Sequence, residues 1–385
     1  MTADIDPSEI DQQFPVITEG GLDALRRMIG VPITESVEPW CYEVTRDNIR
    51  HYAHGIGDDN PLWCDPGYAG RSSYGSLIAP PSFVFALNRV LSGYVGGLPG
   101  VHAMWSGADI TWHRPLEIGA RIRCEAHLKD LVEHQTSFAG RAIQQIYQVD
   151  FFDQDDHHLV SADSWCFRTE RDAARELGTK YEAAKEEPAP YNREDIEEVW
   201  ARYAAETVRG SEPRYVEEVH VGDELPPMVK GPMTVTGFIA FAQGWGGLYI
   251  RANRLAWQQQ QKHPGLGIPD RFGIPDVPER VHWDDHLARL VGTPRAYDYG
   301  PERCSWLIHH LTDWIGDDGF VVNHQSKIRR HNPVGDIVSI AGSVQSIGTD
   351  DAGSPVVEIE QRAVNQDGEL SALGTGIVRL PSRNS

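Results

Sequence analysis

Tyr147–Arg168 reads YQVDFFDQDDHHLVSADSWCFR, and Ile359–Arg379 reads IEQRAVNQDGELSALGTGIVR. Each stretch has an alternating strand, a polar turn and a second alternating strand, which is the pattern of a β-hairpin. Gln154 in the first turn corresponds to Gln366 in the second, at an offset of 212 residues. Because a fixed offset is typical of an internal repeat, we predict that the two halves of the chain share one fold.

The repeat continues upstream of the hairpins, but its offset changes there. His113–Gly119 (HRPLEIG) resembles His331–Gly335 (HNPVG), at offsets of 218 and 216, whereas Tyr52–Gly57 (YAHGIG) matches Phe241–Gly246 (FAQGWG) at 189. The second half therefore carries about thirty extra residues, roughly 248–281. This insertion is polar at first and then rich in Pro and Gly, so we expect a short helix followed by a loop. Loops of this length are usually functional or disordered.

Each half shows the same order of expected elements. A short helix leads to an irregular loop, a longer helix follows, and four alternating strands come last. The expected helices are Thr45–Gly55 and Ser82–Leu91 in the first half, and Val235–Gln243 and Glu302–Ile315 in the second. A helix wrapped by an antiparallel sheet, twice over, is an α+β architecture of two equivalent modules. We expect one module over 1–170, a charged helical linker over 171–216 and the second module over 217–385, with the insertion at 248–281.

Composition narrows the classes of partner. The formal net charge of −21 argues against nucleic acid or an anionic membrane as the main partner. Five scattered cysteines without a CxxC motif fit a reducing compartment and argue against a zinc ribbon, so no metal site is expected. The N-terminus shows no signal peptide, and no apolar run approaches the ~20 residues that cross a bilayer. The expected location is the cytoplasm.

The loop after the first short helix carries a family resemblance. Gly57–Ala69 reads GDDNPLWCDPGYA, which resembles the loop Gly-Asp-x-Asn-Pro-(Leu/Ile)-His-x-Asp of the MaoC-like acyl-CoA hydratases and dehydratases. Trp63 stands where that family has its catalytic His. The second half supplies the other end of the motif as His282-Trp283-Asp284, but the repeat puts Gly247 opposite Asp58. The resemblance covers nearly the whole chain and implies a double hot-dog fold, with a first half similar to FAS1-like dehydratases.

The resemblance also implies a chemistry. Hydration of a 2-enoyl thioester needs a water activated at the β carbon and a proton for the α carbon, which a paired Asp and His can provide. A backbone N–H at a helix start polarises the thioester carbonyl, and the matching position here is Gly300. Asn60 corresponds to the residue that orients the water or the Asp. The expected reaction uses no cofactor, and coenzyme A enters only as part of the substrate.

The candidate site residues each have a structural alternative. We interpret His282 as catalytic, with a loop His that caps a helix as the alternative. Asp58 matches the catalytic Asp of the family, but it has lost its local partner and could serve only to hold the loop. A composite pair of Asp58 and His282 would cross two separate loops and is not favoured. Asp276 is the preferred carboxylate partner of His282, with Asp284 as the other local choice.

The remaining expectations concern the helix entrance and the overall function. Tyr297 and Tyr299 could contact the acyl group or the thioester, or could simply pack. His309 and His310 are expected to be a half-exposed pair on the long second helix. We expect a hydratase or dehydratase of 2-enoyl-CoA and 3-hydroxyacyl-CoA thioesters, with its site in the second half. A non-catalytic acyl-CoA-binding subunit and a hot-dog thioesterase are the alternatives. The expected assembly is a homodimer or a heteromer with another hot-dog protein.

Overall fold

One antiparallel sheet of nine strands runs through both halves of the chain. The computed structural model describes residues 16–33, 40–136, 140–170 and 190–384. The strand order is β2-β3-β4-β1-β8-β11-β10-β9-β5. The strands are β1 (His102–Trp112), β2 (Arg123–Thr136), β3 (Gly140–Phe152), β4 (His158–Thr169), β5 (Met228–Lys230), β8 (Phe320–Ile328), β9 (Val338–Thr349), β10 (Pro355–Asn365) and β11 (Leu370–Arg379).

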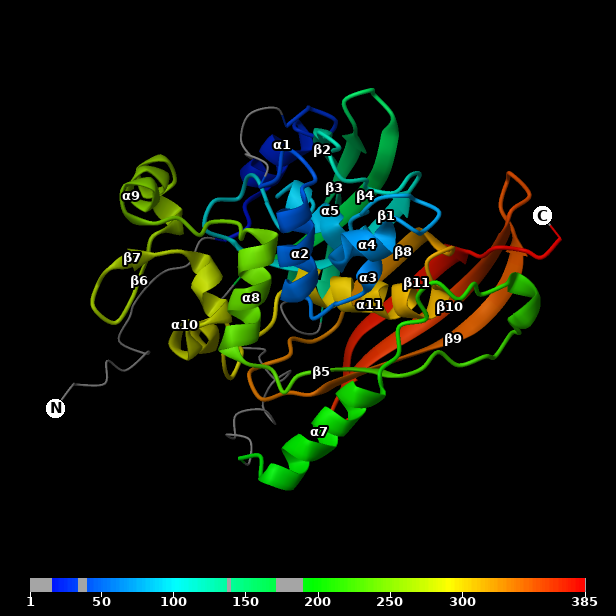
Figure 1. The fold of residues 1–385 in the computed structure, drawn as a ribbon. Helices are drawn as coiled ribbons and strands as arrows, with labels where there is room; N and C mark the ends of the chain where they lie inside the picture. Colours follow the sequence, from blue (N-terminus) through cyan, green and yellow to red (C-terminus); the bar gives the residue numbers. More distant parts are fainter. Residues whose placement is uncertain (1–15, 34–39, 137–139, 171–189, 385) are drawn as a thin grey trace.

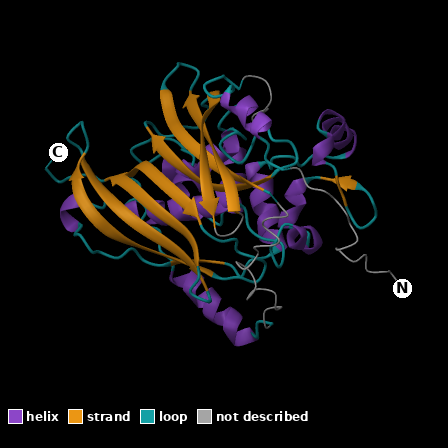
Figure 2. Ribbon diagram, turned by 180° about the vertical axis from the view of Figure 1, so that it is seen from behind, coloured by secondary structure: helices purple, strands orange, loops and turns teal. Residues whose placement is uncertain are grey.

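The two halves of the sheet are related as the repeat predicts. The order β2-β3-β4-β1 in the first half is repeated in reverse as β8-β11-β10-β9 in the second. The halves join where β1 pairs antiparallel with β8, with Ala108 opposite Ser326 and Ile110 opposite His324. Figure 2 shows the sheet as one curved layer with most of the helices behind it. The expected α+β double hot-dog fold is confirmed.

The central helix of the second half is long and enclosed. α11 (Gly300–Ile315) begins with Pro301 in its first turn, and every residue from Pro301 to Ile315 is buried. It lies against the sheet in Figure 1, and its buried surface comes from both modules because β1, β8 and β11 all contact it. The predicted helix Glu302–Ile315 is confirmed and starts two residues earlier. α11 therefore runs from its start at Gly300 into the core between the two modules.

The matching helix of the first half is much shorter than predicted. A 3₁₀ turn at Pro81–Phe83 runs into α5 (Val84–Leu87), and the helix ends there. Asn88 has an extended backbone, and its side chain accepts a hydrogen bond from the Val90 amide. Asn side chains compete with the helix for backbone groups in this way. The expected helix Ser82–Leu91 is therefore wrong beyond Leu87.

Two short helices, one from each half of the chain, pack side by side. α2 (Arg46–Gly55) and α8 (Val235–Trp245) agree with the predicted helices to within two residues. Each begins with a threonine cap, Thr45 and Thr234, whose hydroxyl accepts an amide hydrogen bond from the first turn. Figure 1 shows the two helices next to each other over the sheet. They place the loops that follow them at opposite ends of α11.

The insertion forms a lobe at the side of the molecule. It contains α9 (Asn253–Lys262), a small hairpin of β6 (Ile268–Pro269) and β7 (Pro275–Asp276), and a 3₁₀ turn at Pro278–His282, and α10 (Asp285–Leu290) follows it. This agrees with the expected helix and loop, apart from the hairpin. No residue of α9 is buried, and the lobe stands apart from the sheet in Figure 1.

Four further α-helices lie in the described ranges. They are α1 (Glu19–Arg26), α3 (Pro61–Cys64), α4 (Pro66–Ala69) and α7 (Arg193–Ala205). Of the predicted linker 171–216, residues 171–189 lie outside the described part of the chain, and α7 occupies much of the rest. Asn192 and Asp195 form a capping box at its start. No helix within the described ranges is both long and apolar enough to span a membrane.

Candidate active site

His282 and Trp63 occupy equivalent places in the two halves. Two residues after Trp63, Asp65 caps α4 by accepting the Gly67 and Tyr68 amides. Two residues after His282, Asp284 caps α10 in the same way. Each Asp is the last residue of the His-x-Asp pattern. The structure therefore agrees with the sequence match in which His282 stands where the first half has Trp63.

His282 is held as a neutral imidazole with one free nitrogen. Its Nδ1 lies 2.7 Å from the carbonyl oxygen of Tyr297, so Nδ1 carries the proton and donates. The ring stacks on Tyr299 with 3.7 Å between ring centroids. Among the described residues Nε2 has no hydrogen-bond partner. Burial lowers the pKa of His282 to about 4, which leaves the Nε2 lone pair available as a base at neutral pH.

A buried carboxylate that the motif did not predict shares a contact to Tyr299 with this histidine. Glu279 is 5% exposed, and its carboxylate accepts hydrogen bonds from the Leu248 and Tyr249 amides at 3.0 and 2.8 Å. The Tyr299 hydroxyl donates to Glu279 Oε1 at 3.3 Å. Tyr299 thus contacts both His282 and Glu279. Burial raises the pKa of Glu279, which favours its protonated form.

Glu279 fills the place that the repeat leaves empty. A Cβ built on Gly247 would lie 3.0 Å from Glu279 Oε1. Gly247 is the position that the repeat matches to Asp58, so the carboxylate of Glu279 lies where a side chain at Gly247 would point. It reaches that place from the end of the insertion. Family spacing could not find it, because Glu279 is only three residues before His282.

The two carboxylates that the sequence favoured are bound elsewhere. Asp276 lies 3.6 Å from Arg280, and Asp284 lies 2.9 Å from the same guanidinium while it caps α10. Neither makes a hydrogen bond or ion pair with His282 within the described part of the chain. Asp276 and Asp284 are therefore bound to Arg280, whereas His282 contacts Tyr299, which in turn contacts Glu279.

The entrance of α11 completes this site. Gly300 is the first residue of the helix, where backbone N–H groups have no partner within the helix. The positive end of the helix dipole lies there as well. A Cβ on Gly300 would be 2.5 Å from the Trp105 ring, so β1 of the first module packs directly on this turn. The Gly300 amide is thus a donor at a helix start, as the resemblance implies for the thioester carbonyl.

A buried ion pair fixes the residues before the helix. Arg303 donates to both carboxylate oxygens of Asp298, which lies between Tyr297 and Tyr299. Asp298 also accepts from the backbone and side-chain nitrogens of Asn332 at 2.9 and 2.7 Å. All three side chains are buried. This network sets the backbone that holds His282 Nδ1 on one side and the Tyr299 ring on the other.

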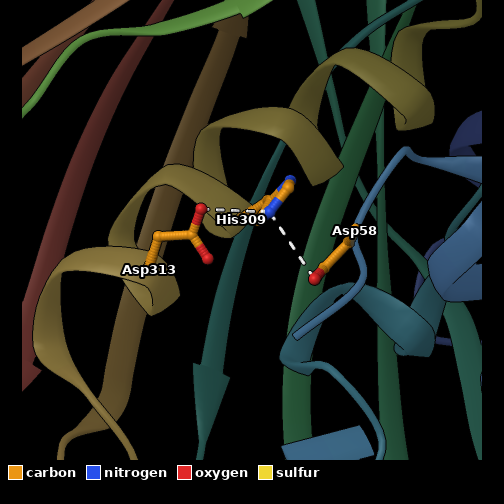
Figure 3. Close-up of side chains that lie close together, drawn as sticks. All are labelled: Asp58, His309 and Asp313. Carbon is orange, nitrogen blue, oxygen red and sulfur yellow. Dashed lines mark ion pairs between the residues drawn. The ribbon is translucent and has the colours of Figure 1, made fainter. Parts of the chain in front are cut away.

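The first-half loop forms a different cluster at the far side of α11. Asp58 Oδ1 lies 3.5 Å from His309 Nε2, and that nitrogen lies 3.2 Å from Asp313 Oδ2 (Figure 3). Lys230 Nζ lies 3.2 Å from His309 Nδ1. His309 and His310 are both buried, so the expectation of a half-exposed pair is wrong. Their helix is enclosed by both modules rather than by one.

Burial shifts the pKa values of the acid–base groups in this second cluster. Burial lowers the pKa of His309 to about 4 and raises the pKa of Asp313 to about 7. Burial also raises the pKa of Asp58 and lowers that of Lys230. Asp58 accepts the Asn60 amide at 3.0 Å, while the Asn60 side chain caps α3 through the Leu62 amide. Asp58 and Asn60 therefore hold the loop, and Asp58 pairs with His309 rather than with His282.

The cluster also contains donors that suit a divalent cation. One oxygen of Asp58, one of Asp313 and one nitrogen of His309 lie within 4.8 Å of one another. Lys230, however, contacts the other nitrogen of the same imidazole and donates to the carbonyls of Ile56 and Gly57. A charged lysine there opposes a second cation. Asp58 Oδ2 and Asp313 Oδ1 are buried without a hydrogen-bond partner among the described residues, so the four side chains satisfy one another only in part.

The first half of the chain is similar to known proteins. Residues 28–162 match the model of the FAS1-like dehydratase domain region. A UPF0336 protein of Streptomyces avermitilis is 31% identical over 126 residues, which cover 31% of this chain and 81% of that protein. A UPF0336 protein of Thermobifida fusca is 34% identical over 98 residues, which cover 24% of this chain and 64% of that protein.

Solved structures resemble the chain over nearly its whole length. A MaoC-like dehydratase has a TM-score of 0.65 at 18% identity, covering 93% of this chain and 100% of that one. The Mycobacterium tuberculosis protein Rv0216, described as a double hotdog fold, has a TM-score of 0.53 at 11% identity, covering 90% and 95%. The chain has a double hot-dog fold like that of these structures. Through its N-terminal half, the chain belongs to the family of the UPF0336 proteins.

Proposed function

We propose that the protein is a hydratase or dehydratase of 2-enoyl and 3-hydroxyacyl thioesters that acts through His282. The observation that carries this proposal is the state of His282 at the entrance of α11. Its Nδ1 is committed to the Tyr297 carbonyl, which leaves Nε2 as an unshared base. Glu279 and the Gly300 amide supply the two other groups that the reaction needs.

The reaction can be written with these groups alone. In hydration, His282 Nε2 takes a proton from water as the water oxygen bonds to C3 of the enoyl group. The electron pair moves toward the thioester oxygen, where the Gly300 N–H at the helix start stabilises the developing charge. Glu279 in its protonated form gives a proton to C2. The proton on His282 then returns to Glu279, and dehydration runs through the same steps in reverse.

The substrate class follows from the same reasoning. A thioester makes C2 acidic enough for this chemistry, and coenzyme A is the expected carrier, bound as part of the substrate. No separate cofactor takes part in the proposed steps. The proposed assembly is a homodimer or a heteromer with another hot-dog protein. A non-catalytic acyl-CoA-binding role is the second candidate, which the replacement of the first-half His by Trp63 favours.

The test is hydration of crotonyl-CoA, mesaconyl-CoA and a long-chain 2-enoyl-CoA by the purified full chain. His282→Gln and Glu279→Gln should each lower kcat at least a hundredfold, the usual range for loss of an acid–base group. Asp276→Asn is the matched control, because it changes a carboxylate in the same insertion that contacts Arg280 instead. Full activity in His282→Gln would refute the proposal. Acyl-CoA binding without turnover by the unmodified protein would favour the second candidate.

A further inference from the structure

The first-half loop and the middle of α11 bring three possible metal ligands together. Asp58 comes from the loop after α2, and His309 and Asp313 lie one turn apart on α11 (Figure 3). The three residues are 1%, 5% and 9% exposed. His309 lies nine residues beyond Gly300, which is about 14 Å along the helix, so this group is separate from the candidate active site.

The donor atoms are spaced as ligands of one ion are. Zn²⁺ binds nitrogen and carboxylate oxygen at about 2.0–2.2 Å, so two ligands of a tetrahedral ion lie roughly 3.3–3.6 Å from each other. His309 Nε2 lies 3.5 Å from Asp58 Oδ1 and 3.2 Å from Asp313 Oδ2. One donor atom from each of the three residues lies within 4.8 Å of the other two. Small adjustments therefore allow all three side chains to bind one ion, with water as a fourth ligand.

Protons alone leave this group incompletely bonded. His309 Nε2 carries at most one proton, which cannot point at two carboxylates at once. Asp58 Oδ2 and Asp313 Oδ1 are buried, and neither has a hydrogen-bond partner within the described ranges. Buried polar atoms without a partner cost free energy. Because a carboxylate binds a metal through one oxygen or both, one cation would give each carboxylate a partner.

The contacts of Lys230 fit an ion when its amine is neutral. Lys230 Nζ lies 3.3 and 3.4 Å from the carbonyl oxygens of Ile56 and Gly57, and 3.2 Å from His309 Nδ1. A neutral amine has two N–H donors for these carbonyls and one lone pair, which accepts from His309 Nδ1–H. His309 Nε2 is then unprotonated, as a metal-binding imidazole must be. The charge of a divalent ion and the two carboxylates then cancels, which lowers the cost of burying them.

The donor set also selects the kind of ion. An imidazole nitrogen suits Zn²⁺ and similar transition ions, whereas Mg²⁺ and Ca²⁺ prefer oxygen ligands alone. Asp58 and His309 are 251 residues apart in the sequence and belong to different modules, so ligand spacing could not predict their meeting.

We propose that Asp58, His309 and Asp313 bind one zinc ion, which links the first-half loop to α11. The ion would hold the two modules together where β1 and β8 also join them. This inference does not depend on the activity proposed for His282.

The experiment measures metal bound to the full chain, first stripped with EDTA and then dialysed against Zn²⁺ or Mg²⁺. We expect one tightly bound equivalent of Zn²⁺ and an affinity for Mg²⁺ at least about a hundredfold weaker. Asp58→Asn and Asp313→Asn keep the side-chain shape but remove the charge. Each should weaken Zn²⁺ binding at least about a hundredfold, since even groups behind the ligands change metal affinity by up to that factor.

The matched control is Asp153→Asn. Asp153 belongs to another group of possible ligands, with Asp155 and His157, on the turn between β3 and β4. This variant should keep the tight zinc equivalent. Saturating Zn²⁺ should raise the melting temperature of the control and of the unmodified protein but not that of Asp58→Asn, because an ion that binds only the folded chain stabilises it.

Two results would overturn the proposal. One is the absence of a tight zinc equivalent in the unmodified protein, and the other is a tight equivalent that survives in both Asp58→Asn and Asp313→Asn. If neither variant folds, X-ray absorption of zinc bound to the unmodified protein decides the question. One imidazole nitrogen with oxygen neighbours is expected, whereas sulfur or several imidazoles around the zinc would contradict this site.

Discussion

Gly55 and Gly244 contact equivalent backbone atoms of each other's helix. A Cβ on Gly55 would lie 2.9 Å from the Ala240 carbonyl oxygen, and a Cβ on Gly244 would lie 2.4 Å from that of His51. The two glycines are 189 residues apart in the sequence, and so are the two residues that carry the carbonyls, His51 and Ala240. The repeat offset seen in the sequence is therefore also the symmetry of the helix contact, and α2 and α8 pack about a local twofold relation.

This contact predicts an unequal response to alanine within one helix. Gly244→Ala should destabilise the protein by about 1–3 kcal/mol, because the new methyl group overlaps backbone that cannot move aside. Gly237→Ala in the same helix is the control, since its Cβ meets only the Thr234 hydroxyl at 3.4 Å. Alanine favours the helix at either position. Denaturant unfolding measures both effects, and equal midpoints for the two variants would contradict the close contact.

The pH dependence of hydration tests the protonation state of His282. Its pKa is lowered to about 4, so the neutral base persists well below the usual range of histidine. Because protonation of Glu279 can only favour hydration as the pH falls, we expect kcat/KM not to decrease from pH 7.5 to 5.5. A histidine with the usual pKa near 6.5 would lose about nine-tenths of its base form at pH 5.5. A tenfold fall in kcat/KM over this interval would contradict the buried neutral imidazole, provided that circular dichroism shows the protein folded throughout.

Much of the fold could be predicted because the repeat appears in local patterns. The hairpins, the long helix α11 and the helices α2 and α8 each depend on residues near in sequence. The prediction of a first-half helix beyond Leu87 was wrong, because the Asn88 side chain hydrogen-bonds to the backbone and the helix ends there. Helical spacing in the apolar residues carries no sign of that competition.

The site was predictable only in part, because the insertion changes which residues meet. Family spacing pointed to His282 and to the helix entrance at Gly300, and both lie at one site. It could not point to Glu279, whose carboxylate reaches the Gly247 position from another direction. Nor could it place His309 against Asp58, since their contact joins the two modules. Contacts between modules leave no periodic pattern in either one.

The buried pair of Arg303 and Asp298 should matter for both stability and activity. Asp298→Ala leaves a guanidinium buried without its carboxylate, which typically costs 3–5 kcal/mol. Asp298 also holds Asn332, so the loop with Tyr297 and Tyr299 should lose its fixed position. Exposed Asp47→Ala in α2 removes a surface ion pair with Arg50 and is the control, with an effect below about 1 kcal/mol. Thermal unfolding compares them, and equal melting temperatures would argue against the buried pair.

His310 should make the protein sensitive to mild acid. Its Nε2 lies 2.8 Å from the Pro226 carbonyl and therefore donates, while its Nδ1 accepts from Gln361 Nε2 at 2.9 Å. A second proton on the ring would oppose the Gln361 donor, and burial lowers the pKa of His310 to about 4. The unfolded chain takes up this proton near pH 6.5, but the folded protein does so only near pH 4. Stability from this group is thus complete above pH 6.5 and falls as pH drops toward 4.

The slope of stability against pH measures this contribution. Between pH 6 and 4.5 one such histidine lowers the free energy of unfolding by up to about 1.4 kcal/mol per pH unit. Other buried groups shift the total slope, so the comparison is with His310→Gln, which keeps a side chain able to donate to the Pro226 carbonyl. We expect the variant to show a slope smaller by close to one proton, by denaturant unfolding at several pH values. Identical slopes for His310→Gln and the unmodified protein would mean that His310 is already protonated in the folded state.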